Sequence, residues 1–166
     1  AGEGACFLHV PKTSSHRPRN TGWFAAFGAL QEKHAGRVPY APDAGAFWGA
    51  TFDPSGLYRL AAALQWRESI GLTTQLTRSH ARGLQQRFVS GLTPAHPIRA
   101  DQLVVPLADE QRGQFLTFRT PDAKRISTEL KQRHVITDAR DDRLRFGFGP
   151  YQDEADVDAL LERLGQ

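Results

Sequence analysis

Hydrophobic and polar positions alternate most clearly in the stretch RLRFGFG, which starts at Arg143. One side of an extended chain here would carry only apolar side chains, and the other would carry arginines and a glycine, so the stretch predicts a β-strand with one buried face. The apolar positions are Leu144, Phe146 and Phe148, and the others are Arg143, Arg145 and Gly147. Glycines and a proline at 147–150 then end the strand.

A helix is predicted directly after this turn, because the apolar residues now recur at helical spacing. Its stripe consists of Val157, Leu160, Leu161 and Leu164. Acidic residues fill its first turn, where they are favourable beside the positive end of the helix dipole.

The segment 114–166 is predicted to have the order strand, helix, strand, strand, helix. QFLTFR alternates, and a helix with Ile126 and Leu130 on its apolar side is expected to open at Pro121 and Asp122. HVITDA is rich in β-branched residues, and ARDD reads as a turn that brings RLRFGF back antiparallel. The fold class is therefore α/β, with an α+β unit at the C-terminal end.

Two helices are predicted upstream. Asp53 and Pro54 form a helix start, and the helix runs to about Glu68. Its expected buried stripe is Leu57, Leu60, Ala61 and Leu64. A second helix spans about 73–90, with its apolar face at Leu76, Leu84 and Phe88, and with His80 as a core or interface histidine. Residues 91–113 read as a connector with one short strand at 103–105.

The N-terminal stretch GEGACFLHVP predicts a buried strand, in which Cys6 would be a small core residue. Residues 12–22 and 31–46 lack periodicity and read as loops. Between them lies the apolar segment GWFAAFG, in which Trp23 either packs in the core, stacks on a substrate or faces a partner subunit.

Composition narrows the possible functions. The 166 residues carry a net charge of +3 and one cysteine, so we expect neither a nucleic-acid-binding stripe nor an internal disulfide, and we expect a cytoplasmic protein. No apolar run is long enough to span a membrane, and the start lacks a signal peptide. The histidines show no metal-ligand spacing, so no metal is expected.

Two positions remain ambiguous on spacing alone. Arg145 either extends to water from its strand or pairs with an anion such as a ligand carboxylate, which its planar guanidinium suits. Thr51 either begins the turn before the helix at 54 or helps that helix start to bind a phosphate.

The C-terminal pattern LRFGFGPYQDEADVDALLERL resembles that of class V aminotransferase-type, fold type I pyridoxal-phosphate enzymes, especially their kynureninase-like branch. The Gly-Trp segment at 22–23, Gly-Ala-Thr before the helix at 54 and the Asp-x-Arg pattern before the final strand are similar to the same family. Phe52 stands where the family motif has a proline.

The resemblance implies roles for three residues. Arg145 would bind the α-carboxylate of an amino-acid substrate, and Trp23 would lie near the substrate. Thr51 would contact the phosphate of pyridoxal 5'-phosphate in the neighbouring subunit of a homodimer. Residues 135–142 contain no cysteine, which argues against desulfurase chemistry and favours a kynureninase-like or aminotransferase enzyme.

The resemblance also implies a domain division. Residues 1–71 would be the end of the large cofactor-binding domain, 72–113 the linker helix and connector, and 114–166 the small domain. The lysine that binds the cofactor would precede Ala1, since Lys12 follows the predicted strand, so we expect the chain alone to be inactive. The alternative is a non-catalytic interaction or dimerisation module.

Overall fold

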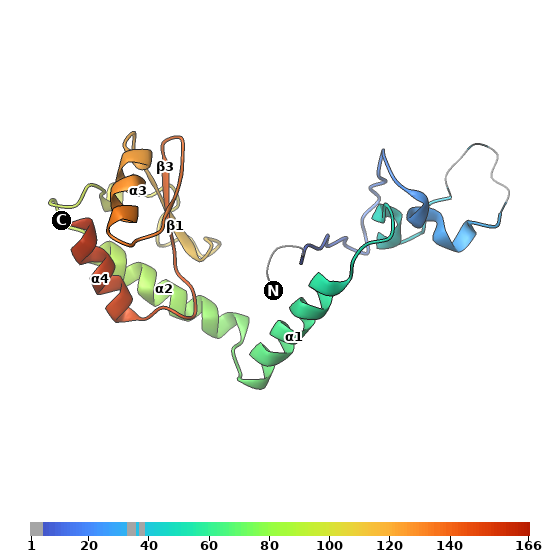
Figure 1. Ribbon diagram of the computed structural model, residues 1–166, viewed down its shortest axis with the longest axis horizontal. Helices are drawn as coiled ribbons and strands as arrows, with labels where there is room; N and C mark the ends of the chain where they lie inside the picture. Colours follow the sequence, from blue (N-terminus) through green and yellow to red (C-terminus); the bar gives the residue numbers. More distant parts are fainter. Residues whose placement is uncertain (1–4, 33–35, 37–38) are drawn as a thin grey trace. The chain divides into compact units, whose positions relative to one another are not determined.

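The computed structural model describes residues 5–32, 36 and 39–166. The chain divides into two compact units, Ala1–Ile70 and Gly71–Gln166 (Figure 1). The longest helix of the second unit, α2 (Thr74–Ser90), contributes to the same core as the sheet that follows it. The finer division into large-domain end, connector and small domain stays a prediction.

The second unit is built on a three-stranded antiparallel sheet. In chain order its elements after α2 are η3 (Ala100–Gln102), β1 (Phe115–Arg119), α3 (Ala123–Gln132), β2 (Asp138–Arg140), β3 (Arg143–Gly147) and α4 (Glu154–Leu164). The strand order is β1-β3-β2, so β3 is the central strand. The predicted order of strand, helix, strand, strand, helix for 114–166 is confirmed.

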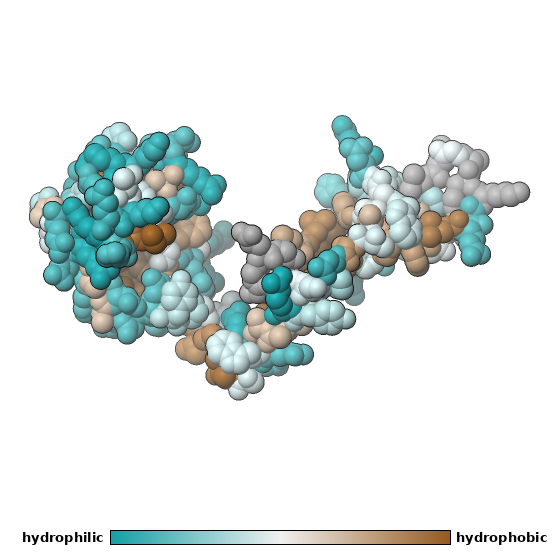
Figure 2. Space-filling model, in the orientation of Figure 1, coloured by the Kyte–Doolittle hydropathy of each residue, from teal (hydrophilic) through white to brown (hydrophobic). Residues whose placement is uncertain are grey.

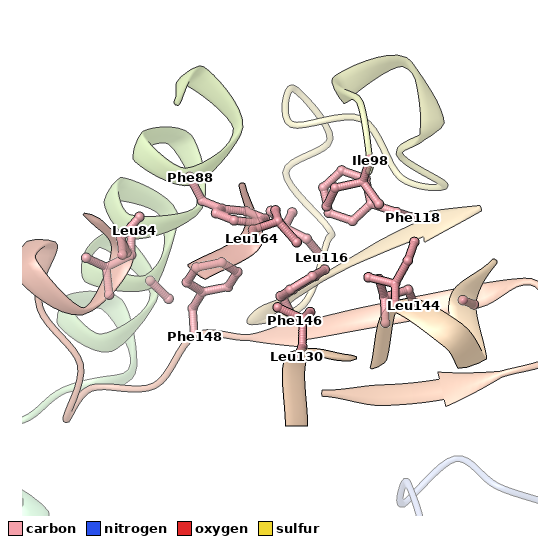
Figure 3. Packing of buried hydrophobic residues seen from close by; sticks show 14 residues of the cluster. Leu84, Phe88, Ile98, Leu116, Phe118, Leu130, Leu144, Phe146, Phe148 and Leu164 are labelled. Carbon is pink, nitrogen blue, oxygen red and sulfur yellow. The ribbon is translucent and has the colours of Figure 1, made fainter. Parts of the chain in front are cut away.

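Side chains from one face of this sheet form a core with the three α-helices. Phe88 of α2 lies at its centre, with ring centroids 6.1, 5.1 and 5.8 Å from those of Phe118, Phe146 and Phe148 (Figure 3). Leu144, Phe146 and Phe148 are all buried, which confirms the alternation predicted for the final strand. Ile126 and Leu130 of α3 are buried as predicted, and Ile98 from the connector is also fully buried.

Polar contacts fix the start of α4 and its pairing with α2. Asp153 accepts a hydrogen bond from the backbone N–H of Asp156 at 3.0 Å, and the Asp156 side chain accepts one from the Asp153 N–H at 3.0 Å. This reciprocal pair is a capping box. Arg87 of α2 forms ion pairs with Glu154 at 2.9 Å and Asp158 at 2.7 Å, so α2 and α4 lie side by side (Figure 1).

Two predictions in this unit are wrong in detail. The strand expected at HVITDA begins only at Asp138, and Ile136 is 79% exposed. His134 takes a left-handed conformation with φ 60°, and the Val135 N–H bonds back to the Leu130 carbonyl at 2.9 Å, so this segment ends the helix instead of starting a strand. Leu76 is exposed because it lies in the first turn of α2, beyond the core.

The connector makes less strand than predicted. Leu103 forms an isolated bridge with Phe118, and the Val104 N–H bonds to the Thr117 carbonyl at 2.9 Å. The loop that follows is held by Arg112, whose Nε donates to buried Gln85 at 2.9 Å and whose Nη1 donates to the Leu107 carbonyl. Burial and neighbouring arginines lower the pKa of Arg112 from its ordinary value.

The first unit contains η1 (Trp23–Ala29), η2 (Ala44–Phe47) and α1 (Ser55–Ser69), and few of its described residues are buried. α1 forms where it was predicted, with its first residue one position later, but its apolar stripe is not covered within the unit. Figure 2 shows hydrophobic residues on the visible surface of this unit, whereas the visible face of 71–166 is mainly hydrophilic.

The strand expected at the N-terminal end is not formed in the described residues 5–10. Phe7 is 80% exposed, and Cys6 is exposed and not in a core, because the described residues of 1–70 contain no strand that could pair with this stretch. Residues 1–4 of that prediction lie outside the described residues. Within the described ranges, no helix has both the length and the apolar character needed to cross a bilayer.

Candidate functional site

The sheet face opposite the core carries the arginines predicted for the polar side of the final strand. β3 pairs with both neighbours, so Arg145 lies directly between Asp138 of β2 and Thr117 of β1. One step along the same face, Arg143 lies between Arg140 and Arg119. Like charges directly opposite each other are unfavourable in a sheet, so this row requires compensating anions.

Two aspartates supply that compensation within the chain. Asp138 forms ion pairs with Arg145 at 3.3 Å and Arg140 at 3.4 Å, and Asp142 pairs with Arg143 and, at 3.6 Å, with Arg119. Four guanidiniums that share two carboxylates leave this face with a net charge of +2. The face is therefore suited to an anionic ligand.

Arg145 is held on two sides. Its Nη1 lies 3.3 Å from Oδ2 of Asp138, and its guanidinium carbon lies 5.5 Å from the centroid of the Phe115 ring, a cation–π contact. The side chain remains 40% exposed. It can therefore meet a ligand without breaking either contact.

Arg143, two residues earlier on the same face, could also receive a carboxylate but is placed differently. Its Nη1 is paired with the carboxylate of Asp142, the adjacent residue, through a close hydrogen bond. Because a hydrogen bond already occupies this nitrogen, Arg143 offers fewer unpaired N–H groups than Arg145 to a carboxylate.

The first unit brings together the segments that carry Trp23 and Thr51. The Phe24 N–H donates to the Gly49 carbonyl at 3.4 Å, and a Cβ on Gly22 would lie 1.7 Å from that same oxygen. Only glycine at position 22 allows this approach. Trp23 is 49% exposed and contacts the rings of Phe24 and Phe27, at centroid distances of 4.9 and 5.6 Å, so it is not a fully packed core residue.

Thr51 is exposed and lies two residues before the Asp53–Ser55 turn that opens α1. Its hydroxyl is accessible to a phosphate. The helix start itself suits an anion less well, because Asp53 already accepts hydrogen bonds there from the Ser55 N–H at 2.9 Å and hydroxyl at 2.6 Å. These two donors also lower the pKa of Asp53 from its ordinary value. Thr51 thus offers one hydroxyl donor here, while the negative charge of Asp53 disfavours an anion at this helix start.

Among the described residues, no group of three or more histidine, cysteine or acidic residues could hold a metal ion. His80 is exposed and lies 2.7 Å from the Gln152 carbonyl through Nε2, which joins α2 to the turn before α4.

Asp138 and Phe115 are the site residues that sequence reasoning missed. Both were assigned to strands, but their position beside Arg145 depends on the strand register. For Asp138 a signal was present: the turn ARDD centres the hairpin on 141–142, which places position 138 opposite 145. Phe115 could not be placed, since its partner on β3 is Gly147, 32 positions later in the chain.

Comparison with known proteins agrees with this architecture. The family model described as "Kynureninase C-terminal domain" matches residues 68–164. The chain is also 31% identical, over 163 residues, to a protein of Deinococcus radiodurans named kynureninase. That alignment covers 94% of this chain and 38% of the relative, so the chain spans well under half of the relative's length. From its α2–α4 unit and this match, the chain belongs to the kynureninase C-terminal domain family.

Proposed function

We propose that the protein to which this chain belongs is a pyridoxal-phosphate-dependent enzyme acting on an amino acid, and that this chain supplies the site for the substrate carboxylate. The observation that carries the proposal is Arg145: a half-exposed guanidinium on the central strand, ion-paired at one nitrogen and open elsewhere. The name of the Deinococcus relative makes kynurenine the first substrate to examine.

The residues of this chain would act by binding and orienting. A guanidinium offers two parallel N–H groups to a carboxylate, which fixes both the position and the plane of that group. Bond cleavage at an amino acid requires the breaking bond to stand in a defined orientation, and a two-point hold on the substrate supplies it. When bound, pyridoxal phosphate supplies the electron sink for the negative charge that develops on the substrate.

The hydroxyl of Thr51 is proposed to donate a hydrogen bond to the cofactor phosphate, across the interface of a cytoplasmic homodimer. Thr51→Ala is expected to weaken cofactor affinity in the intact protein by about 1 kcal/mol, the scale of one hydrogen bond. A titration followed by cofactor absorbance measures this, and an unchanged dissociation constant in a folded variant would remove Thr51 from the site.

The test of the main proposal compares two arginines on the same face. Arg145→Ala in the intact enzyme is expected to lower kcat/KM for the amino acid and to leave cofactor binding nearly unchanged. The loss should correspond to roughly 2–3 kcal/mol of transition-state stabilisation, the contribution of a charged hydrogen bond. Arg145→Lys is also expected to raise KM, since an ammonium cannot form the planar fork. If Arg143→Ala abolishes substrate binding while Arg145→Ala retains it, the assignment of the carboxylate to Arg145 is wrong.

The chain by itself is proposed to be inactive. Incubation of residues 1–166 with pyridoxal phosphate and borohydride is expected to leave no single lysine selectively modified. Selective labelling of one lysine together with turnover of an amino acid would contradict this.

A non-catalytic interaction module is the second candidate, and the uncovered apolar side chains of 1–70 favour it. Under this alternative the chain would associate through that surface, and the intact protein would show neither cofactor absorbance nor turnover. Absorbance spectra of the intact protein separate the two functions.

A further inference from the structure

We propose that Asp138 and Phe115 are positioning residues that hold the guanidinium of Arg145 in the orientation needed for a planar carboxylate. The inference rests on the proposed function, in which Arg145 receives the substrate carboxylate. It explains why Arg145 would prefer a carboxylate to other anions. Neither residue needs to touch the ligand.

The sheet places these side chains on either side of Arg145. Asp138 is its direct cross-strand partner on β2, and Phe115 lies on β1, diagonally displaced by two residues. Gly147 is the direct partner of Phe115 and has no side chain, so the ring meets no side chain opposite it. The ring instead lies 5.5 Å from the guanidinium carbon of Arg145, a distance at which diagonal pairs in a sheet interact.

The contact with Asp138 holds the guanidinium without using up its donors. Nη1 lies 3.3 Å from Oδ2, and within the described part of the chain the guanidinium of Arg145 donates no hydrogen bond. The same oxygen lies 3.4 Å from Nε of Arg140, so Asp138 is shared and does not form a two-bond fork with either arginine. Arg145 therefore keeps an N–H edge for a ligand while its head is restrained by charge on one side and by the ring on another.

A simpler role for Asp138 would be to neutralise charge. The two roles predict different effects on the ratio of carboxylate affinity to spherical-anion affinity. Removing a carboxylate raises the affinity of a positive face for every anion, whatever its shape. Removing a positioning group lowers the preference for a planar carboxylate over a spherical anion, because the fork geometry is lost.

The experiment uses the 166-residue chain, the Nε–Hε NMR signal of Arg145 and two probes, acetate and chloride, titrated separately at constant ionic strength. The signal is assigned by its loss in Arg145→Lys. Asp138→Asn and Phe115→Leu are expected to lower the ratio of acetate to chloride affinity by about threefold. The matched control is Asp142→Asn, which removes the other shared carboxylate of the face and is expected to leave the ratio at Arg145 unchanged. Asp138→Glu should recover part of the ratio, and amide spectra verify that each variant is folded.

The outcomes separate this inference from the proposed function. No acetate response of the Arg145 signal in the parent chain overturns both. An Arg145-dependent response in which Asp138→Asn strengthens acetate and chloride alike overturns the positioning role and leaves the carboxylate assignment standing. Equal loss of the ratio in Asp142→Asn and Asp138→Asn also overturns it, since the effect would then belong to the charge of the whole face.

Discussion

Residues 71–166 bury most of their phenylalanine side chains, whereas residues 1–70 leave most of their aromatic side chains exposed. In the former, phenylalanines from α2, β1 and β3 meet in one buried cluster, and Phe88 and Phe118 have no exposed surface. In the latter, Trp48 and Phe52 contact each other and remain half exposed, and the buried hydrophobic residues that the structure describes there are Ala25 and Ala46. Both regions are rich in aromatic residues, so composition does not separate them.

The difference shows what is needed to bury apolar side chains in a core. In 71–166 one face of a sheet and three helices present apolar side chains to one another, so each element buries those of the others. Among the described residues of 1–70, no sheet or second α-helix of the same unit faces the apolar stripe of α1, and the two short 3-10 helices cannot cover it. An amphipathic helix is stabilised mainly by packing of its apolar face, so α1 is expected to be less stable than α2, α3 and α4.

The largest expected effect concerns the closed core. Phe88→Ala should lower the free energy of unfolding of 71–166 by roughly 3–5 kcal/mol, because it leaves a cavity among three other rings. Trp66→Ala, on the exposed side of α1, is the contrast and should change the free energy of unfolding of 1–70 by less than about 0.5 kcal/mol. Urea denaturation followed by circular dichroism measures both. A comparable loss for Trp66→Ala would show that the α1 surface is buried in solution.

The next prediction tests whether residues 1–70 adopt a specific structure. Gly22→Ala should disturb the contact with Gly49 at a local cost of about 1–3 kcal/mol, since a Cβ has no room there. Gly28→Ala is the matched control, because a Cβ at Gly28 would meet nothing within 4 Å. The indole N–H shifts of Trp23 and Trp48 report the change. Identical spectra for the two variants would mean that the Gly22–Gly49 approach does not form.

A smaller effect is expected from the capping box of α4. Asp153→Ala removes the acceptor for the Asp156 N–H and should destabilise 71–166 by about 1 kcal/mol. Glu162→Ala, on the exposed side of the same helix, should be nearly neutral. Thermal denaturation of the two variants side by side decides the matter, and equal melting temperatures would show that the cap contributes nothing.

The smallest effect is a dependence on pH. The hydrogen bond from Arg87 holds the pKa of Asp158 below its ordinary value of 3.8, so ionised Asp158 stabilises the fold. This contribution is present above the unfolded-state pKa and is lost as the pH falls through the folded-state pKa. Asp158→Asn should therefore lose less thermal stability than the parent when the pH falls from about 5 to about 2. A parent and variant that lose stability in parallel would place the acid sensitivity elsewhere.

Sequence reasoning succeeded where local pattern and packing agree. The final strand and α4 were predicted with their buried residues, since alternation, a Gly-Pro turn and an acidic first turn all point to the same structure. It failed for α1 and for the N-terminal stretch, where apolar residues were assumed to be buried. Burial depends on a second surface, and periodicity says nothing about where that surface comes from.

The candidate site was predictable to the same extent. The alternation correctly placed Arg145 on the polar face of its strand, whereas the central position of that strand comes from the sheet topology. Its contacts with Asp138 and Phe115 follow from strand register, which is set by turns and by pairing between distant segments. Trp23 and Thr51 were identified separately, and the approach of Gly22 to Gly49 and the ring contact of Phe24 with Trp48 show that their segments are neighbours.

The alternation of β3 also limits how such a site can be altered. Leu144 and Arg145 are consecutive, so moving the guanidinium by one residue would turn an arginine into the core and a leucine out of it. The arginine can therefore shift along the strand only by two residues at a time, a displacement of about 6.7 Å, which exceeds the size of a carboxylate. Adjustments to substrates of slightly different length must come instead from side chains on β1 and β2, which makes those two strands the natural place to engineer specificity.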